Sequence, residues 1–160
     1  MEKTLEQRIS MRPVSIPDDE RFLQHLYFSS RGDLHGLFAD EHQMRQLLLM
    51  QYKAQATSYS RQFPSAEHDI IMLDEDPIGR LIIDRDAKAA RLIDITLLPE
   101  SRNLGIGTLI LTRFSELFAS LELEFELSVQ RTNPARQLYE RLGFKLVGED
   151  ETRLRMRWSN

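Results

Sequence analysis

The segment Arg102-Asn-Leu-Gly105-Ile-Gly107 places one cation and two glycines between an apolar stretch and a helical pattern. The amino-terminal end of a helix carries N–H groups without acceptors and a partial positive charge. Glycines allow the backbone to approach an anion closely, and an arginine adds charge beside it. The spacing therefore predicts a turn that binds phosphate groups.

Two well-known nucleotide-binding patterns do not fit this loop. A dinucleotide-binding fingerprint needs a third glycine, and its ribose-binding acid would follow at the end of the next strand, where the sequence has Ser128-Val-Gln130. A Walker A loop needs Gly-Lys-Ser/Thr, which is absent. On these six residues alone, a tight turn without a ligand remains the competing interpretation, because short glycine patterns are weak signals.

A second segment, Asn133-Pro-Ala-Arg136-Gln-Leu-Tyr139-Glu-Arg-Leu-Gly143-Phe144, follows farther along the chain. Together with residues 97–108 it resembles, in order and spacing, the GNAT superfamily of N-acetyltransferases. In that family a strand, an Arg/Gln-x-x-Gly-x-Gly/Ala loop and a helix hold the pyrophosphate of acetyl-CoA, and the later segment lines the thioester end. The close match covers about residues 77–148. Asn103 departs from the pattern, because the family often has glycine there.

The resemblance implies acetyl-CoA as the co-substrate, with no metal ion, and a set of donor-binding residues. Leu97 or Leu98 is expected to offer a backbone N–H to the thioester oxygen. Asn133 is also expected to cap a helix, whereas Arg136 either reaches a phosphate of CoA or is a solvated helix charge. The residues implied for donor binding are Leu97, Leu98, Arg102, Asn103, Leu104, Gly105, Ile106, Gly107, Thr108, Asn133 and Arg136.

Tyr139 is the candidate general acid. A phenol has a reference pKa near 10, above the ~8.5 of a simple thiol, so it is neutral at pH 7. It can then hydrogen-bond or pass a proton to a departing thiolate. The competing interpretation is structural, because Tyr139 lies next to the apolar stripe of Leu138 and Leu142 and would fit the edge of the core.

Asp94 is the candidate general base. It lies on the strand before the glycine loop, among several apolar residues, and a carboxylate in such surroundings needs an explanation. A lysine-like acceptor amine has a pKa of ~10.4, so a base that removes its proton would assist the reaction. The competing interpretations are that Asp94 points to solvent or bonds a neighbouring strand.

The acceptor is expected to be a primary amine of an unidentified small molecule or protein. Thr96, Ser128 and Gln130 are predicted to contact it as polar groups of one groove. Arg31, with Asp33 and His35, lies in the least regular part of the amino-terminal half and is a further candidate, although the histidine would equally suit an ordinary surface. A non-catalytic module that binds acyl-CoA on the same fold is the alternative function.

Composition bounds the remaining possibilities. The 160 residues suit a single domain over 1–160, with residues 1–7 as a polar, flexible tail. The absence of cysteine excludes disulfides, thiol nucleophiles and thiolate metal sites. A net charge of −4 disfavours a nucleic-acid partner. No apolar run suits a membrane span or a signal peptide, and no histidine spacing suits a metal, so a cytoplasmic protein is expected.

Apolar periodicity, turn residues and helix caps predict the order β-α-α-β-β-β-α-β-α-β-β, an α+β or mixed α/β fold. The resemblance implies a central, mostly antiparallel sheet of about seven strands flanked by four helices. The last strand, with Met156 and Trp158, either pairs with a second subunit in a homodimer or is buried within the monomer. The expected strands are residues 9–13, 69–73, 78–85, 91–98, 124–130, 144–148 and 153–158, and the expected helices begin at Ser15, Asp40, Gly105 and Asn133.

Overall fold

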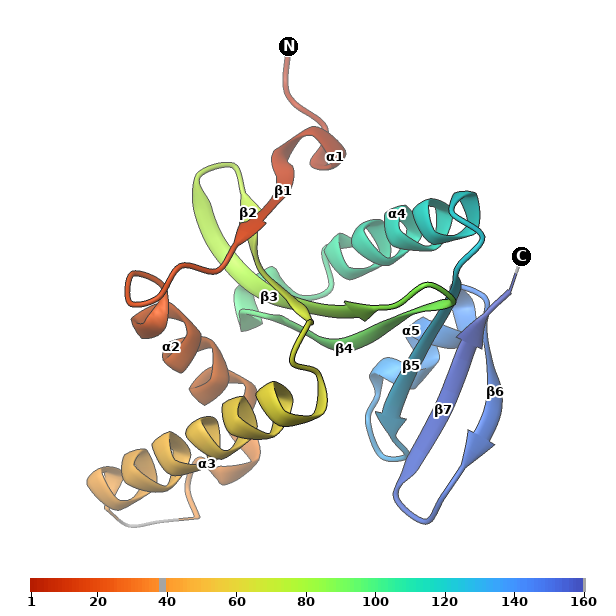
Figure 1. The fold of residues 1–160 in the computed structure, drawn as a ribbon. Coiled ribbons are helices and arrows are strands. Elements are labelled where there is room, and N and C mark those ends of the chain that lie inside the picture. Colours follow the sequence, from red (N-terminus) through yellow and green to blue (C-terminus); the bar gives the residue numbers. More distant parts are fainter. Residues whose placement is uncertain (38–39, 160) are drawn as a thin grey trace.

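Seven strands form one sheet in the order β1-β2-β3-β4-β5-β7-β6 (Figure 1). The computed structural model describes residues 1–37 and 40–159. All neighbouring strands are antiparallel except β4 and β5, which run parallel, so the predicted mostly antiparallel sheet is confirmed. The strands are β1 (Ile9–Pro13), β2 (Glu67–Leu73), β3 (Asp76–Arg85), β4 (Ala89–Leu97), β5 (Glu124–Gln130), β6 (Phe144–Glu149) and β7 (Arg153–Trp158).

Helices cover both faces of this sheet (Figure 1). Successive residues of a strand point to opposite faces, so Ile70 of β2 packs with α2 and α3 while Ile71 packs in the larger core beneath α4 and α5. The helices are α1 (Leu5–Arg8), α2 (Glu20–Ser30), α3 (Glu41–Gln62), α4 (Ile106–Ser120) and α5 (Ala135–Arg141), with 3-10 turns at Gly32–Leu34 and Pro99–Ser101.

The amino-terminal region differs from its prediction in two respects. The expected flexible tail includes a one-turn helix, α1, whose cap Thr4 exchanges hydrogen bonds with Gln7. Arg113 of α4 donates to the carbonyl of Glu6 and holds this turn against the domain. The next helix, α2, begins at Glu20 rather than at Ser15, because the segment before it forms a turn.

The carboxyl-terminal strand β7 lies inside the sheet, between β5 and β6. It pairs with both neighbours, and Met156 is buried in the main core. Of the two alternatives for this strand, burial within the monomer is therefore the one that the structure shows. The two edges of the sheet are β1 and β6.

Strands β4 and β5 pair only at their beginnings and then separate. Their ladder runs from Ala89 opposite Glu124 to Leu92 opposite Leu127. A bulge follows at once, because Ile83 of β3 pairs with Leu92 while Ile82 pairs with Asp94, which leaves Ile93 as the extra residue. Beyond the bulge β4 continues beside β3 as far as Leu97, and no strand among residues 1–37 and 40–159 pairs with its other edge. This opening positions the candidate site.

Candidate active site

A cavity of about 930 Å³ joins the glycine loop to the α5 segment beside the opening between β4 and β5. The structure thus brings together two segments that the sequence separates. Predicted residues that line the cavity are Thr96, Leu97, Arg102, Asn103, Gly105, Ile106, Gly107, Thr108, Asn133 and Tyr139.

The glycine loop has the backbone that a phosphate-binding turn requires. Gly105 and Asn103 both adopt left-handed conformations, with φ of 83° and 59°. Asparagine tolerates this region better than most residues, which explains how Asn103 stands where the family often has glycine. The helical ladder begins with the N–H of Leu109 donating to the carbonyl of Gly105 at 3.0 Å. The N–H groups of residues 106–108 precede that ladder at the positive end of α4.

The backbone N–H of Leu97 lies on the edge of β4 that does not pair with β3. Leu98 donates its own N–H to the carbonyl of Ile78 at 2.8 Å. Hydrogen-bonded and non-bonded pairs alternate along an antiparallel ladder, so Leu97, opposite Gly79, directs its N–H away from β3. Its carbonyl likewise faces away and accepts from Nε of Arg102 at 3.1 Å.

Three predicted donor-binding residues lie elsewhere. Leu98 is buried, its N–H is already bonded, and it does not line the cavity. Leu104 is exposed and does not line the cavity. Arg136 forms an ion pair with Glu140 at 2.8 Å, one helical turn away, and does not line the cavity. Arg141, which the sequence did not single out, lines the cavity instead.

Tyr139 of α5 lies at the inner wall of this cavity and is 7% exposed. Its ring packs edge-on against Phe144, with ring centres 5.9 Å apart. Burial, and secondarily the charge of Asp94, raise the pKa of Tyr139 to about 12. The phenol is therefore neutral throughout the physiological range.

At the start of α5, the side-chain oxygen of Asn133 accepts a hydrogen bond from the N–H of Ala135 at 2.9 Å, which confirms its capping role.

Asp94 forms a nearly buried ion pair with Arg80 of β3. Its Oδ2 accepts from Nε of Arg80 at 2.9 Å, and its Oδ1 accepts from the hydroxyl of Thr96 at 2.9 Å. Arg80 also donates to Gln55 of α3 at 3.0 Å. Of the interpretations of Asp94, bonding to a neighbouring strand is therefore the one observed. Oδ2 receives both hydrogen bonds from Arg80, whereas Oδ1 receives one from Thr96 and keeps room to accept another.

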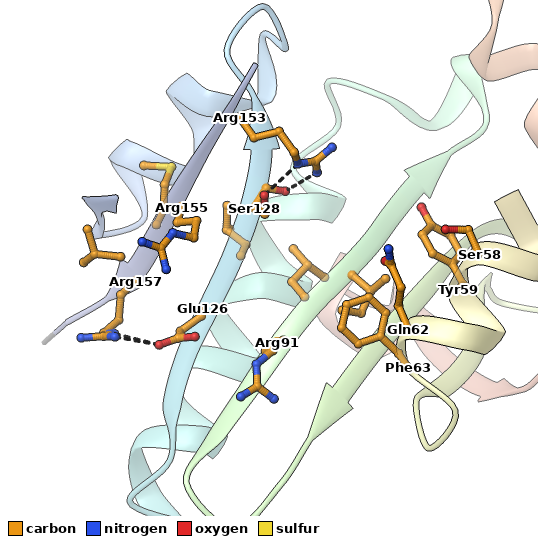
Figure 2. Close-up of a pocket in the computed structure, with 15 residues that line it drawn as sticks. Ser58, Tyr59, Gln62, Phe63, Arg91, Glu126, Ser128, Arg153, Arg155 and Arg157 are labelled. Atoms are coloured by element: carbon orange, nitrogen blue, oxygen red, sulfur yellow. Dashed lines mark hydrogen bonds and ion pairs between the residues drawn. The ribbon is translucent and has the colours of Figure 1, made fainter. Parts of the chain in front are cut away.

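A second cavity, of about 640 Å³, lies where the β4–β5 ladder ends (Figure 2). Its walls come from the last turns of α3, from Leu92 and Ile93 of β4, from Ser128 of β5, and from β7. Sequence reasoning found only Ser128 among them. The missed residues include Tyr59 and Gln62 of α3 and the β7 arginines, whose signal was strict alternation in Arg153-Leu-Arg155-Met-Arg157.

The other predicted acceptor contacts are scattered. Thr96 lines the larger cavity, whereas Gln130 is exposed and lines neither cavity. Arg31 lines neither and instead bonds Asp33, the Tyr27 hydroxyl and Gln51. His35 is exposed.

Residues 1–37 and 40–159 contain no group of three or more histidine, aspartate or glutamate side chains placed to hold a metal ion. Within the same residues, no helix has both the length and the apolar character needed to cross a bilayer.

Comparisons with known proteins agree with this architecture. The chain is 31% identical over 96 residues to the uncharacterized N-acetyltransferase CgeE of Bacillus subtilis (strain 168), a match that covers 53% of this chain and 37% of that protein. The chain thus spans little more than a third of that curated relative.

Solved structures show the same fold. The PaiA N-acetyltransferase of Thermoplasma acidophilum, in complex with coenzyme A, has a TM-score of 0.69 and 23% identity, covering 95% of this chain and 99% of its own. An acetyltransferase of Thermus thermophilus has a TM-score of 0.67 and 18% identity, covering 96% and 98%. The model of the acetyltransferase (GNAT) domain matches residues 63–146, just over half of the sequence, and the chain therefore belongs to the GNAT acetyltransferase family.

Proposed function

We propose that this chain, as a single domain over residues 1–160, transfers the acetyl group of acetyl-CoA to a primary amine by direct attack on the thioester. One observation carries the proposal. The larger cavity unites the amino-terminal end of α4, the free N–H of Leu97 and the neutral phenol of Tyr139 along an unpaired strand edge. Family membership supports the same chemistry.

The glycine loop fits the phosphate groups of CoA. Residues 106–108 present backbone N–H groups at a helix amino terminus, where anions bind well. Arg102 lies beside them and is held by the carbonyl of Leu97. A Cβ on Gly105 would meet nothing within 4 Å, and one on Gly107 would lie 3.6 Å from Leu138, so the protein itself leaves space at both positions. That space suits an anion approaching the backbone closely.

The free edge of β4 fits the thioester end. As the amine attacks, a C–N bond forms, negative charge develops on the carbonyl oxygen, and the C–S bond then breaks. We assign stabilisation of that oxygen to the N–H of Leu97, because preorganised backbone donors are effective where charge develops. The thiolate that leaves must take up a proton, and the attacking nitrogen must lose one.

Tyr139 is suited to assist the leaving thiolate without becoming a lasting phenolate. With its pKa raised to about 12, the phenol is a weaker acid than a thiol near 8.5. Full proton transfer to sulfur is therefore uphill by roughly 3–4 pKa units unless the phenol regains a proton in the same step. The new ammonium nitrogen can supply that proton. Tyr139 then relays it from nitrogen to sulfur, and the products are the amide and free CoA thiol.

Asp94 remains the candidate base, with a constraint from its ion pair. Because Arg80 occupies Oδ2 and Thr96 donates a single hydrogen bond to Oδ1, we propose that Asp94 acts on the amine through Oδ1, directly or by way of a water molecule. Ser128 and Thr96 are the proposed polar contacts of the acceptor on either side of that opening.

Calorimetry with acetyl-CoA and, separately, ATP tests the donor. We expect binding of acetyl-CoA and none of ATP by the full chain. Release of free thiol in the presence of an amine panel then tests turnover. A folded sample that does not bind acetyl-CoA contradicts the proposal, whereas tight binding without thiol release from any amine favours the alternative, a non-catalytic acyl-CoA-binding module.

A further inference from the structure

The smaller cavity has a charge opposite to that of the whole chain. The sequence carries a net charge of −4, yet four arginines and a single glutamate line this cavity. Three of the arginines lie at every second position of β7, so their side chains share one face of the strand, as Figure 2 shows. The intervening Leu154 and Met156 are buried on the opposite face.

Two of the four cations are neutralised by carboxylates. Arg157 binds Glu126 at 2.8 Å and approaches Glu124 at 3.4 Å. Arg91 binds Asp86 at 3.1 Å and approaches Asp84 at 3.6 Å. Arg157, Glu126 and Arg91 lie at the end of the cavity where β4 and β5 are still joined (Figure 2).

The other two have no carboxylate partner among residues 1–37 and 40–159. Arg153 donates to the hydroxyl of Ser128 at 2.8 Å and to its carbonyl at 3.1 Å, which are both neutral acceptors. Arg155, directly opposite Ser128 in the β5–β7 register, lies against Gly148, where a Cβ would collide with its guanidinium. Within the described part of the chain its side chain makes no hydrogen bond.

These two cations lie close to the point where β4 and β5 separate. Ser128 is the residue after Leu127, the last residue of β5 that pairs with β4. Arg153, which is bonded to Ser128, therefore lies next to this point, and the guanidinium of Arg155 lies in the same cavity against Gly148 of β6. Tyr59 lines the same cavity from α3 (Figure 2).

We infer that the acceptor is a small amine that also carries an acid group, a carboxylate or a phosphate, which Arg153 and Arg155 bind. This inference rests on the proposed acetyl transfer. Guanidinium groups present planar, paired donors that match carboxylates and phosphates. A volume of about 640 Å³ suits a small molecule. In this arrangement the acid group of the acceptor contacts the two arginines of β7, and its amine points toward Ile93 and the opening between β4 and β5.

Three probes with the same aminoethyl group test the inference: β-alanine, O-phosphoethanolamine and ethanolamine. Each is titrated calorimetrically into the full chain saturated with CoA, whose binding is verified first. At least one of the two acidic probes should bind with a Kd about tenfold or more below that of ethanolamine, and the better one identifies the acid group. Arg153→Gln and Arg155→Gln should each remove most of that difference while leaving the Kd for acetyl-CoA unchanged.

Arg85→Gln is the matched control, because Arg85 forms an exposed ion pair with Glu67 and does not line the cavity. It should leave all three affinities unchanged. Equal affinities for acidic and neutral probes, absence of binding included, overturn the inference, as does a preference that survives in both β7 variants. Failure of the proposed function is distinguishable, since it appears as no acetyl-CoA binding before any probe is added.

Discussion

Arg80 and Asp94 form an ion pair across β3 and β4 in which each side chain is less than one fifth exposed. The bulge at Ile93 makes the pair possible, because it turns Asp94 onto the face of the sheet where Arg80 lies. Gln55 of α3 also accepts from Arg80, so the pair connects two strands to a helix. Variants of this pair can therefore distinguish a structural role of Asp94 from a role in proton transfer.

Asp94→Asn should lower the free energy of unfolding by about 3 kcal/mol, because it leaves the guanidinium of Arg80 buried without a carboxylate. Urea denaturation measures this loss. The double variant Arg80→Met with Asp94→Leu should recover most of it, since replacing both partners removes the uncompensated charge. If Asp94→Asn retains stability but loses turnover with a shifted pH profile, Asp94 acts in proton transfer rather than in structure.

Tyr139→Phe should lower kcat by about 10²–10⁴-fold, the range expected for loss of a general acid. The ring stays packed against Phe144, so the Kd for acetyl-CoA should change less than about twofold and the fold should remain intact. Because the pKa of Tyr139 is about 12, its ionisation should cause no fall in the rate of the parent protein below about pH 11. Thiol release across the pH range checks both points, and unchanged turnover removes Tyr139 from the acid role.

Most predicted residues of the larger cavity could be found from sequence because they belong to two short local segments. Gly105 and Gly107 lie within one turn of the start of α4, and Tyr139 lies one short helix after the capping Asn133. Local spacing fixes such geometry. Whether Leu97 or Leu98 has the backbone N–H that is not bonded to β3 depends instead on the ladder register. Only the hydrogen bond from Leu98 to Ile78 decides it.

The residues of the smaller cavity were largely missed because the order of the strands brings them together. Arg155 lies opposite Ser128 only because β7 inserts between β5 and β6, and no local pattern reveals that insertion. Arg31 was predicted to contact the acceptor from an irregular segment, but its guanidinium donates hydrogen bonds to Asp33 and Gln51. Arg136 points along α5 to Glu140, and the cavity takes Arg141 instead. Side-chain direction on a short helix depends on its packing.

Asp19 should make stability depend on pH in the acid range. Two hydrogen bonds from Arg12 at 2.8 Å, and secondarily the N–H of Ser15, hold the pKa of this buried carboxyl at about 2, below its usual 3.8. A lowered folded-state pKa contributes stability that is present above pH 4 and is lost as pH falls through 2. Asp19→Asn should therefore cost about 1–3 kcal/mol at pH 6 and much less at pH 2. Urea denaturation at both values tests this, with exposed Asp18→Asn as the control.

Gly107→Ala should separate donor binding from folding. A Cβ there would lie 3.6 Å from Leu138, an ordinary contact, and alanine favours a helix more than glycine, so the free energy of unfolding should not fall. The new methyl group does occupy the cavity wall next to the backbone N–H groups, and the Kd for acetyl-CoA should rise about tenfold, or ~1.4 kcal/mol. Gly105→Ala is the contrasting variant, because its φ of 83° makes any Cβ cost about 1–2 kcal/mol of stability despite open space around it. Calorimetry and urea denaturation of both variants give the comparison. A Gly107→Ala protein that binds acetyl-CoA as tightly as the parent would show that the phosphates lie elsewhere.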